Sequence, residues 1–340
     1  MRRTASHLSH VVPLVATGLG TFLLVLAGLL AWYVEPRAER TSIDVDVTTV
    51  FTGTGSYFDT EKIKTVRDRK ITITRQARGD VAASERSGNA VWDVATSVDT
   101  AKSLPAADPH DALQWTLERW VVDRRTNAPQ HCCGEQPAFS GEAYLKFPFN
   151  LEKRTYTWWD NTLGDTVPLR FSGVTKVQGY EGYRFTGTVP ATRTGSRLVP
   201  GRIVGLPNRS QVLAEEWYAN HGIDLVADQH TGRVIYAAIG PRKTLRAPGS
   251  DKDATVLLDS RRIAFTPDSQ RGQVALARDD NDRLTLLGTT LPIVAGGLGV
   301  LLVAAGLVLV VRGRGGRPEP EGVERPDPDT SPTTLETSTM

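Results

Sequence analysis

Two long apolar runs, one near each end of the chain, limit what this sequence can fold into. Residues 11–34 and 284–311 contain no charged residue in 24 and 28 positions, respectively. An α-helix rises about 1.5 Å per residue, so each run is long enough to cross the roughly 30 Å hydrocarbon core of a bilayer. The sequence therefore predicts two transmembrane helices, at 11–34 and 284–311, that flank an extracytoplasmic domain over residues 35–283.

Positive charges beside the two runs predict their orientation. Arg2 and Arg3 precede the first run, and three arginines follow the second run before any acidic residue. Because basic residues accumulate on the cytoplasmic side, we expect a multi-pass plasma-membrane protein whose N-terminal segment 1–10 and C-terminal tail 312–340 are cytoplasmic. The alternative for the first run is a cleaved signal peptide, after which the second span would still hold the domain to the outer face.

The tail differs in composition from the rest of the chain. It has no aromatic residue and is dominated by Pro, Glu, Asp, Ser and Thr, whereas Trp and Tyr are spread through the central domain. We therefore expect a folded domain followed by a disordered tail. The formal net charge of +2 argues against electrostatic binding to nucleic acid, so no such partner is expected.

Short segments rich in β-branched and aromatic residues dominate the central domain. Gly, Pro, Asn and Asp bound them, and turn signals recur about every ten residues. The clearest segments are 43–51, 70–75, 166–171, 182–189 and 233–239. This pattern predicts an antiparallel β-rich ectodomain, or an α+β one, flanked by the two transmembrane helices.

One helix is expected directly before the second span. Thr266 offers an N-cap, Pro267 suits the first helical position, and Asp268 places an acid in the first turn. The helix should continue into the span and bend near Pro292.

An apolar stretch that meets an Asp recurs at residues 120–127, 158–164 and 225–232. The Asp side chain can cap a turn, and the Asn or Gly three or four residues later tolerates a left-handed conformation. We interpret these segments as β-hairpins. They fit either an ordinary meander or two related β half-domains.

The apolar runs contain no ionisable residue, which argues against a helical pump or carrier. Small residues gather at Gly18 and Gly20 in the first run and at 295–299 in the second. They predict close packing of the two helices, or of neighbouring copies in a homo-oligomer, although glycine is also simply common in membrane helices.

The chain has two cysteines, Cys132 and Cys133, which are adjacent in sequence and follow His131. Thiols tend to oxidise outside the cytoplasm, but adjacent cysteines can pair only through a strained ring. A vicinal disulfide, a bridge to another chain, a metal site with His131 and unpaired thiols all stay open. The metal site lacks a second cluster of ligands.

Catalytic motifs are missing from the sequence. It contains no nucleophile elbow, zinc-protease motif, Walker A loop or dinucleotide fingerprint. Residues 53–56 are Gly-rich and are expected to form a turn, and His221 is expected in a surface turn at 218–222. We therefore predict that the protein is not an enzyme and that it has no catalytic residue, no cofactor and no metal site.

The order of span, β-rich domain and span carries several local motifs. They lie at 122–126, 132–134, 146–149, 153–160 and 179–183. Together they resemble an actinobacterial family of membrane proteins, of unknown function, known as the porin PorA family. The resemblance covers most of residues 11–311 and implies a cell-envelope protein, with no catalytic residues to transfer.

Two classes of function follow from these features. The first is a membrane-tethered domain that binds an envelope lipid, glycan or partner, with an apolar cleft lined by Trp and Tyr from 115–120, 144–159 and 217–218. The same aromatic residues could instead fill a closed core. The second is an oligomeric pore, since two apolar helices cannot line an aqueous path alone.

Overall fold

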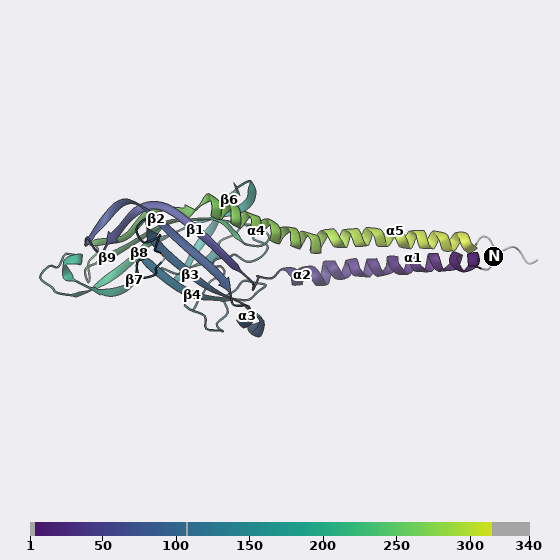
Figure 1. The fold of residues 1–340 in the computed structure, drawn as a ribbon, viewed down its shortest axis with the longest axis horizontal. Helices are drawn as coiled ribbons and strands as arrows, with labels where there is room; N and C mark the ends of the chain where they lie inside the picture. The colour runs from purple at the N-terminus through teal and green to yellow at the C-terminus, as the bar shows by residue number, and fades with distance from the viewer. Residues whose placement is uncertain (1–3, 107, 315–340) are drawn as a thin grey trace, which may run out of the picture. The chain divides into compact units, whose positions relative to one another are not determined.

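The computed structural model describes residues 4–106 and 108–314, which form two compact units. One unit is a helical pair from the two ends of the chain, and the other is the domain Leu30–Thr290 (Figure 1). The helical elements are α1 (Thr4–Leu29), η1 (Leu30–Val34), α2 (Glu35–Ala38), α3 (Val81–Ser87), η2 (Gly201–Val204), α4 (Pro267–Thr285), η3 (Leu286–Thr290) and α5 (Leu291–Arg314). The strands are β1 (Asp46–Asp59), β2 (Lys64–Gly79), β3 (Ala90–Thr100), β4 (Gln114–Val122), β5 (Tyr156–Asp160), β6 (Asp165–Val177), β7 (Tyr180–Val199), β8 (Val212–Ala227), β9 (Val234–Arg246) and β10 (Thr255–Phe265).

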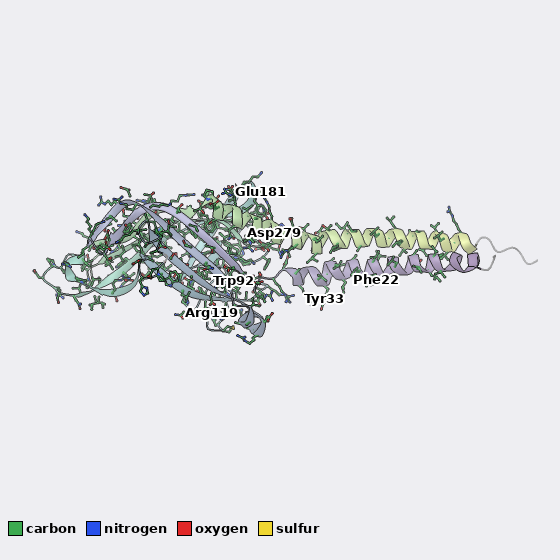
Figure 2. All side chains as sticks on the ribbon, in the orientation of Figure 1. Phe22, Tyr33, Trp92, Arg119, Glu181 and Asp279 are labelled. Carbon is green, nitrogen blue, oxygen red and sulfur yellow. A yellow bond between two sulfur atoms is a disulfide. The ribbon has the colours of Figure 1, made fainter. Side chains whose placement is uncertain are left out.

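The helices α1 and α5 pack side by side (Figure 1). Glycine permits the close approach: a Cβ atom on Gly299 would lie 2.9 Å from the carbonyl oxygen of Gly20. Large apolar side chains cover the outside of the pair, for example Phe22, which is 60% exposed (Figure 2). By length and composition both helices are candidates for membrane spans. The predicted contact between small residues thus occurs within one chain, whereas Gly18 and Gly297 take no part in it.

The domain is built on one ten-stranded antiparallel sheet that curves into a half-barrel (Figure 1). Its strand order is β4-β3-β2-β1-β10-β9-β8-β7-β6-β5, so every neighbour is also a neighbour in sequence except the pair β1 and β10. All five predicted strand segments overlap observed strands, and the predicted antiparallel β-rich fold is confirmed. The strands β4 and β5 are left as the two edges.

The segment 139–151, here called the plug segment, lies between these two edges and fills part of the concave face. Phe139 and Phe147 are almost fully buried, and Phe147 stacks on Phe185 of β7 with ring centres 4.8 Å apart. The backbone N–H of Phe147 donates to the carbonyl of Gly232, at 2.8 Å. The plug segment also bonds to β5, where the N–H of Trp159 donates to the carbonyl of Ala143 at 2.9 Å. Aromatic packing and these backbone bonds together occupy the space in which β4 and β5 do not pair with each other.

The helix α4 begins as the sequence predicts. The hydroxyl of Thr266 accepts a hydrogen bond from the N–H of Ser269 at 3.2 Å, and Pro267 is the first helical residue. Val274 and Ala277 are buried in an apolar cluster with residues of β8 and β9. The helix ends in the π-helical turn η3, after which α5 begins at Leu291, so the irregularity expected near Pro292 falls just before it.

Two predicted turns are wrong. Residues 53–56 lie inside β1, where the backbone of β10 approaches so closely that a Cβ atom on Gly53 would be 2.3 Å from the carbonyl oxygen of Arg262. His221 lies inside β8, at a bulge where the pairing of β8 with β9 shifts between Asn220 and Ile223. At both places the glycine lies at an irregularity within a strand. In the sequence, such a glycine looks the same as a glycine in a turn.

The three Asp-capped segments form turns, but only two connect neighbouring strands. Asp160 caps the turn between β5 and β6, and Asp228 caps the turn between β8 and β9. Asp123 also caps its turn, yet the returning chain makes only two isolated bridges with β4, from Pro129 to Val122 and from Gln136 to Arg119. Pro129 has no N–H with which to extend a ladder beside Val122. A simple meander accounts for the recurrence.

Candidate functional site

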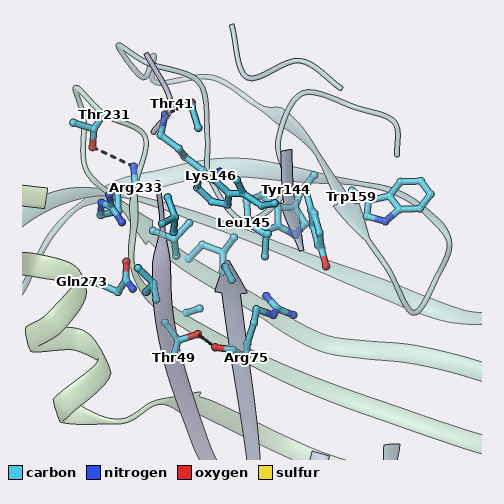
Figure 3. A pocket seen from close by; sticks show the side chains of 18 of the residues that line it. Thr41, Thr49, Arg75, Tyr144, Leu145, Lys146, Trp159, Thr231, Arg233 and Gln273 are labelled. Atoms are coloured by element: carbon cyan, nitrogen blue, oxygen red, sulfur yellow. Dashed lines mark hydrogen bonds between the residues drawn. The ribbon is translucent and has the colours of Figure 1, made fainter. Parts of the chain in front are cut away.

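The concave face of the half-barrel encloses a cavity of ≈ 620 Å³ (Figure 3). Its wall is formed by the inner face of the sheet, the plug segment, the chain after α2 and one side of α4. All of these elements belong to the domain Leu30–Thr290. The apolar part of the wall includes Phe51, Trp92, Phe149, Trp158, Ile223, Ile239, Phe265, Leu284 and Leu287.

Strand periodicity explains this lining. Successive side chains of a strand point to opposite faces, so alternate residues of β1, Val47, Thr49 and Phe51, all reach the cavity. In β2 the same rule places Arg75 and Ala77 on the inner face.

The polar part of the wall is strongly basic. Six arginine and lysine side chains line the cavity, against two carboxylates, Asp160 and Asp280. The basic residues are Arg40, Arg75, Arg124, Lys146, Arg233 and Arg283. Among the residues that the structure describes, only Arg233 of these six forms an ion pair, with Asp280 at 2.7 Å. Asp160 accepts a hydrogen bond from the hydroxyl of Tyr218 at 2.8 Å.

Lys146 of the plug segment is the most unusual of the six. Its side chain is buried, and its Nζ donates to the hydroxyl of Thr41 at 3.2 Å (Figure 3). The ammonium also lies 3.5 Å from the ring centre of Phe149. Burial, reinforced by the nearby positive charge of Arg233, lowers the pKa of Lys146 to about 7.

Arg124 holds a second positive charge at this part of the wall. Its Nε donates to the carbonyl of Thr41 at 3.1 Å. Burial and the neighbouring guanidinium of Arg40 lower the pKa of Arg124. Thr41 thus contacts both basic residues, with its hydroxyl and its carbonyl.

Trp159 adds a hydrogen-bond donor without a partner. Its side chain is 5% exposed, and its Nε1 is the one buried side-chain nitrogen or oxygen in the described part of the chain that makes no hydrogen bond. The neighbouring Tyr144 is satisfied, because its hydroxyl donates to the buried carboxylate of Glu118. Burial, followed by the negative charge of Glu118, raises the pKa of Tyr144 despite the opposing effect of Arg75, so the phenol stays neutral.

The cysteines lie elsewhere, next to α3 and the edge strand β4. The structure joins Cys132 to Cys133 by a disulfide, and the carbonyl of Cys133 accepts from Nε of Arg119 at 2.9 Å. His131 contacts Glu135 at 2.9 Å instead of joining the sulfur atoms in a metal site. No group of three metal-binding side chains comes together in the described residues. That the protein carries this disulfide in its native envelope stays a prediction.

The predicted aromatic lining is partly present. Trp158 and Trp159 line the cavity, whereas Trp120 is buried in the core and Trp115 is 45% exposed. The basic residues are not recognisable as a site in the sequence, because Lys146 and the arginines come from segments far apart along the chain. A lysine between Tyr144-Leu145 and Phe147 was the one local signal.

A sequence model of one protein family matches residues 12–308, and its description is Porin PorA. The chain belongs to the Porin PorA family. No curated protein gives a significant match. Membership in the Porin PorA family, together with the two long apolar helices, indicates a membrane protein.

Proposed function

We propose that this member of the Porin PorA family is a membrane-tethered binding protein. Its extracytoplasmic domain holds an apolar or amphipathic envelope molecule in the half-barrel cavity and does not catalyse covalent chemistry. The observation that carries the proposal is the cavity of ≈ 620 Å³ with a largely apolar and aromatic wall. This volume falls in the range of about 300–1,000 Å³ typical of small-molecule sites.

The covalent path of the chain supports a ligand from the membrane. Leu284 and Leu287 contribute to the cavity wall and are also the first and fourth residues of the second apolar run. The cavity wall therefore continues directly along the chain into a candidate span. In the proposed topology both termini are cytoplasmic, as the arginines outside the two runs favour.

An oligomeric pore is the second candidate, and the family name favours it. Several copies would have to associate, and Gly18 and Gly297 are available for helix packing, because in the described structure no atom of the other helix would lie within 4 Å of a Cβ added to either glycine. The outer face of the sheet carries charges such as the pair Arg184 and Asp224, at 2.8 Å. A transmembrane barrel has an apolar outer band instead, so these charges favour a half-barrel surrounded by water.

Native mass spectrometry of the full chain extracted in mild detergent tests the binding function. We expect a co-purifying amphiphile with the wild type and its loss with Ala77→Trp, which fills the cavity from β2. Ala95→Trp is the matched control, because Ala95 pairs with Gln76 on the opposite face of the sheet and does not line the cavity. The control should retain the amphiphile.

Planar-bilayer recordings separate the two candidates. Reproducible absence of any bound amphiphile from the wild type, together with unitary conductance steps, would refute the binding function in favour of the pore. Amphiphile loss in both tryptophan variants would show that the effect does not come from the cavity.

A further inference from the structure

We infer that the cavity binds an anionic amphiphile, with its phosphate or carboxylate group held by Lys146 and Arg124 and its hydrocarbon part held by the aromatic wall. This inference rests on the proposed function and specifies the ligand. The need for an anionic group distinguishes this cavity from a site for neutral lipid or for an unsubstituted hydrocarbon.

The charge of the wall favours an anionic ligand. Six basic side chains face two carboxylates, and of those two, Asp280 is already paired with Arg233. Arg40 and Arg283 are exposed, but Lys146 is buried and Arg75 and Arg124 are partly buried, and none of these three has an ion-pair partner in the described residues. Such positions are unfavourable for a lone cation, because charges shielded from water need a counter-charge. An anionic ligand would supply that counter-charge.

The geometry around Lys146 leaves room for a further hydrogen-bond acceptor. Its side chain is 9% exposed, and the hydroxyl of Thr41 is its hydrogen-bond acceptor in the described structure. Both partners of this hydrogen bond are held in place. The side-chain amide of Asn127 donates to the backbone carbonyl of Lys146 at 2.7 Å, and Thr41 is buried, at 2% exposed. The ammonium is therefore held in position while two of its three hydrogens remain for another acceptor.

The hydrogen-bonding capacity left over at this part of the wall is donor capacity. Lys146 and Arg124 each spend one donor on Thr41 and keep further N–H groups, and Nε1 of Trp159 has no partner in the described structure. None of the three side chains can accept, so a pure hydrocarbon ligand would leave these remaining donors unpaired. Phosphate and carboxylate groups offer only acceptors when ionised, and hydrogen bonds between ionised groups are the strong ones.

The apolar wall distinguishes an amphiphile from a free anion. Phe51, Trp158 and Ile239 line the same cavity, and an inorganic anion would contact none of them favourably. An acyl chain would exclude water from this surface and gain the free energy of apolar burial. The two parts of the wall together match the two parts of an anionic lipid.

Binding of two short-chain lipids to the full chain in uncharged detergent tests the inference. The probes are dioctanoyl phosphatidic acid and dioctanoyl phosphatidylcholine, which have the same chains and differ in net charge. For the wild type we expect a preference for the anionic lipid of roughly tenfold or more, the value of one charge-assisted hydrogen bond.

Lys146→Met should bring the two affinities close together, and Lys146→Arg should restore the preference. Lys243→Met is the matched control, because Lys243 is a partly buried lysine of β9 that contacts Gln114 and does not line the cavity. It should keep the wild-type preference.

The outcomes separate the inference from the proposed function. Equal binding of both lipids by the wild type would overturn the anionic ligand and leave a cavity for neutral amphiphiles. Binding of neither lipid would overturn both. Inorganic phosphate that displaces phosphatidic acid at a similar concentration would show a site for free anions and overturn the amphiphile.

Discussion

Replacing Lys146 by methionine should make the ligand-free domain more stable. The lysine is buried and forms no ion pair in the described structure, and the carboxylates of Asp280, Asp228 and Glu39 only partly offset its burial. Folding therefore has to remove its ammonium from water or release its proton. Methionine has a similar length and no charge, and it adapts to irregular apolar spaces. The substitution should therefore raise the free energy of unfolding, whereas most substitutions of buried residues lower it.

The pKa of Lys146 gives the magnitude. Its fall from 10.5 to about 7 on folding corresponds to an upper limit of roughly 5 kcal/mol, at about 1.4 kcal/mol per pH unit. The hydrogen bond to Thr41 and the contact with the Phe149 ring are lost in the variant. We expect a net gain of about 1–4 kcal/mol at neutral pH, as found when hydrophobic residues replace buried ions.

The gain in stability from Lys146→Met decreases as the pH rises. Between pH 7 and pH 10.5 the unfolded chain binds a proton at Lys146 that the folded chain has released, so the stability of the wild type rises with pH in this window. The advantage of Lys146→Met is therefore largest below pH 7 and shrinks toward pH 10. Burial also lowers the pKa of Lys243, to about 8, so Lys243 makes stability rise with pH in both proteins. This contribution cancels when the stability of the wild type is subtracted from that of the variant.

Urea unfolding of the full chain in detergent, followed by tryptophan fluorescence at about pH 6 and about pH 9.5, measures this difference. Lys176→Met, at an exposed position of β6, is the control and should change stability little at either pH. A ligand-free Lys146→Met variant that is less stable than the wild type at pH 6, or a difference that is independent of pH, would refute the reasoning. Dioctanoyl phosphatidic acid should stabilise the wild type far more than the variant.

Three further predictions concern topology, the cysteines and one turn. Protease treatment of intact cells should cleave near Trp159 and leave the C-terminal tail protected. Mass spectrometry of the non-reduced peptide with Cys132 and Cys133 should show the loss of two hydrogens within one peptide. Gly232→Ala should destabilise the domain by more than ~1 kcal/mol, because φ is +71° and the new Cβ would lie 2.2 Å from the carbonyl oxygen of Phe147. Gly249→Ala has a similar φ of +72° and open space around it, so it should cost less.

Each of these has a contrary result. Cleavage of the tail together with protection of the Trp159 region would reverse the topology. Free thiols in protein from the native envelope, or a disulfide-linked dimer on a gel, would reject the vicinal pair. Equal stability of the two alanine variants would mean that backbone conformation alone, and not contact with the plug segment, requires Gly232.

Local features of the sequence were sufficient for the long helices, the start of α4 and five of the ten strands. The uncharged runs at 11–34 and 284–311 predicted the long helices, and Thr266-Pro267 predicted where α4 begins, because length, hydropathy and capping act within a few residues. Alternation of β-branched and aromatic residues predicted the strands for the same reason. The turn signals were misleading at residues 53–56 and at His221. There the glycine is required by the approach of a neighbouring strand and not by a turn in its own segment.

The cavity could not be predicted in this way. Its basic wall combines Arg40 from the chain after α2, Arg124 from the turn after β4, Lys146 from the plug segment and Arg283 from α4. What brings them together is the pairing of β1 with β10 and the docking of the plug segment between β4 and β5, both of which depend on contacts between residues distant in sequence. The sequence by itself indicated the two long apolar helices, the start of α4 and five of the ten strands. Only the tertiary structure decided that an unpaired lysine would be buried beside an apolar cavity, because burial and electrostatic environment are properties of the folded chain.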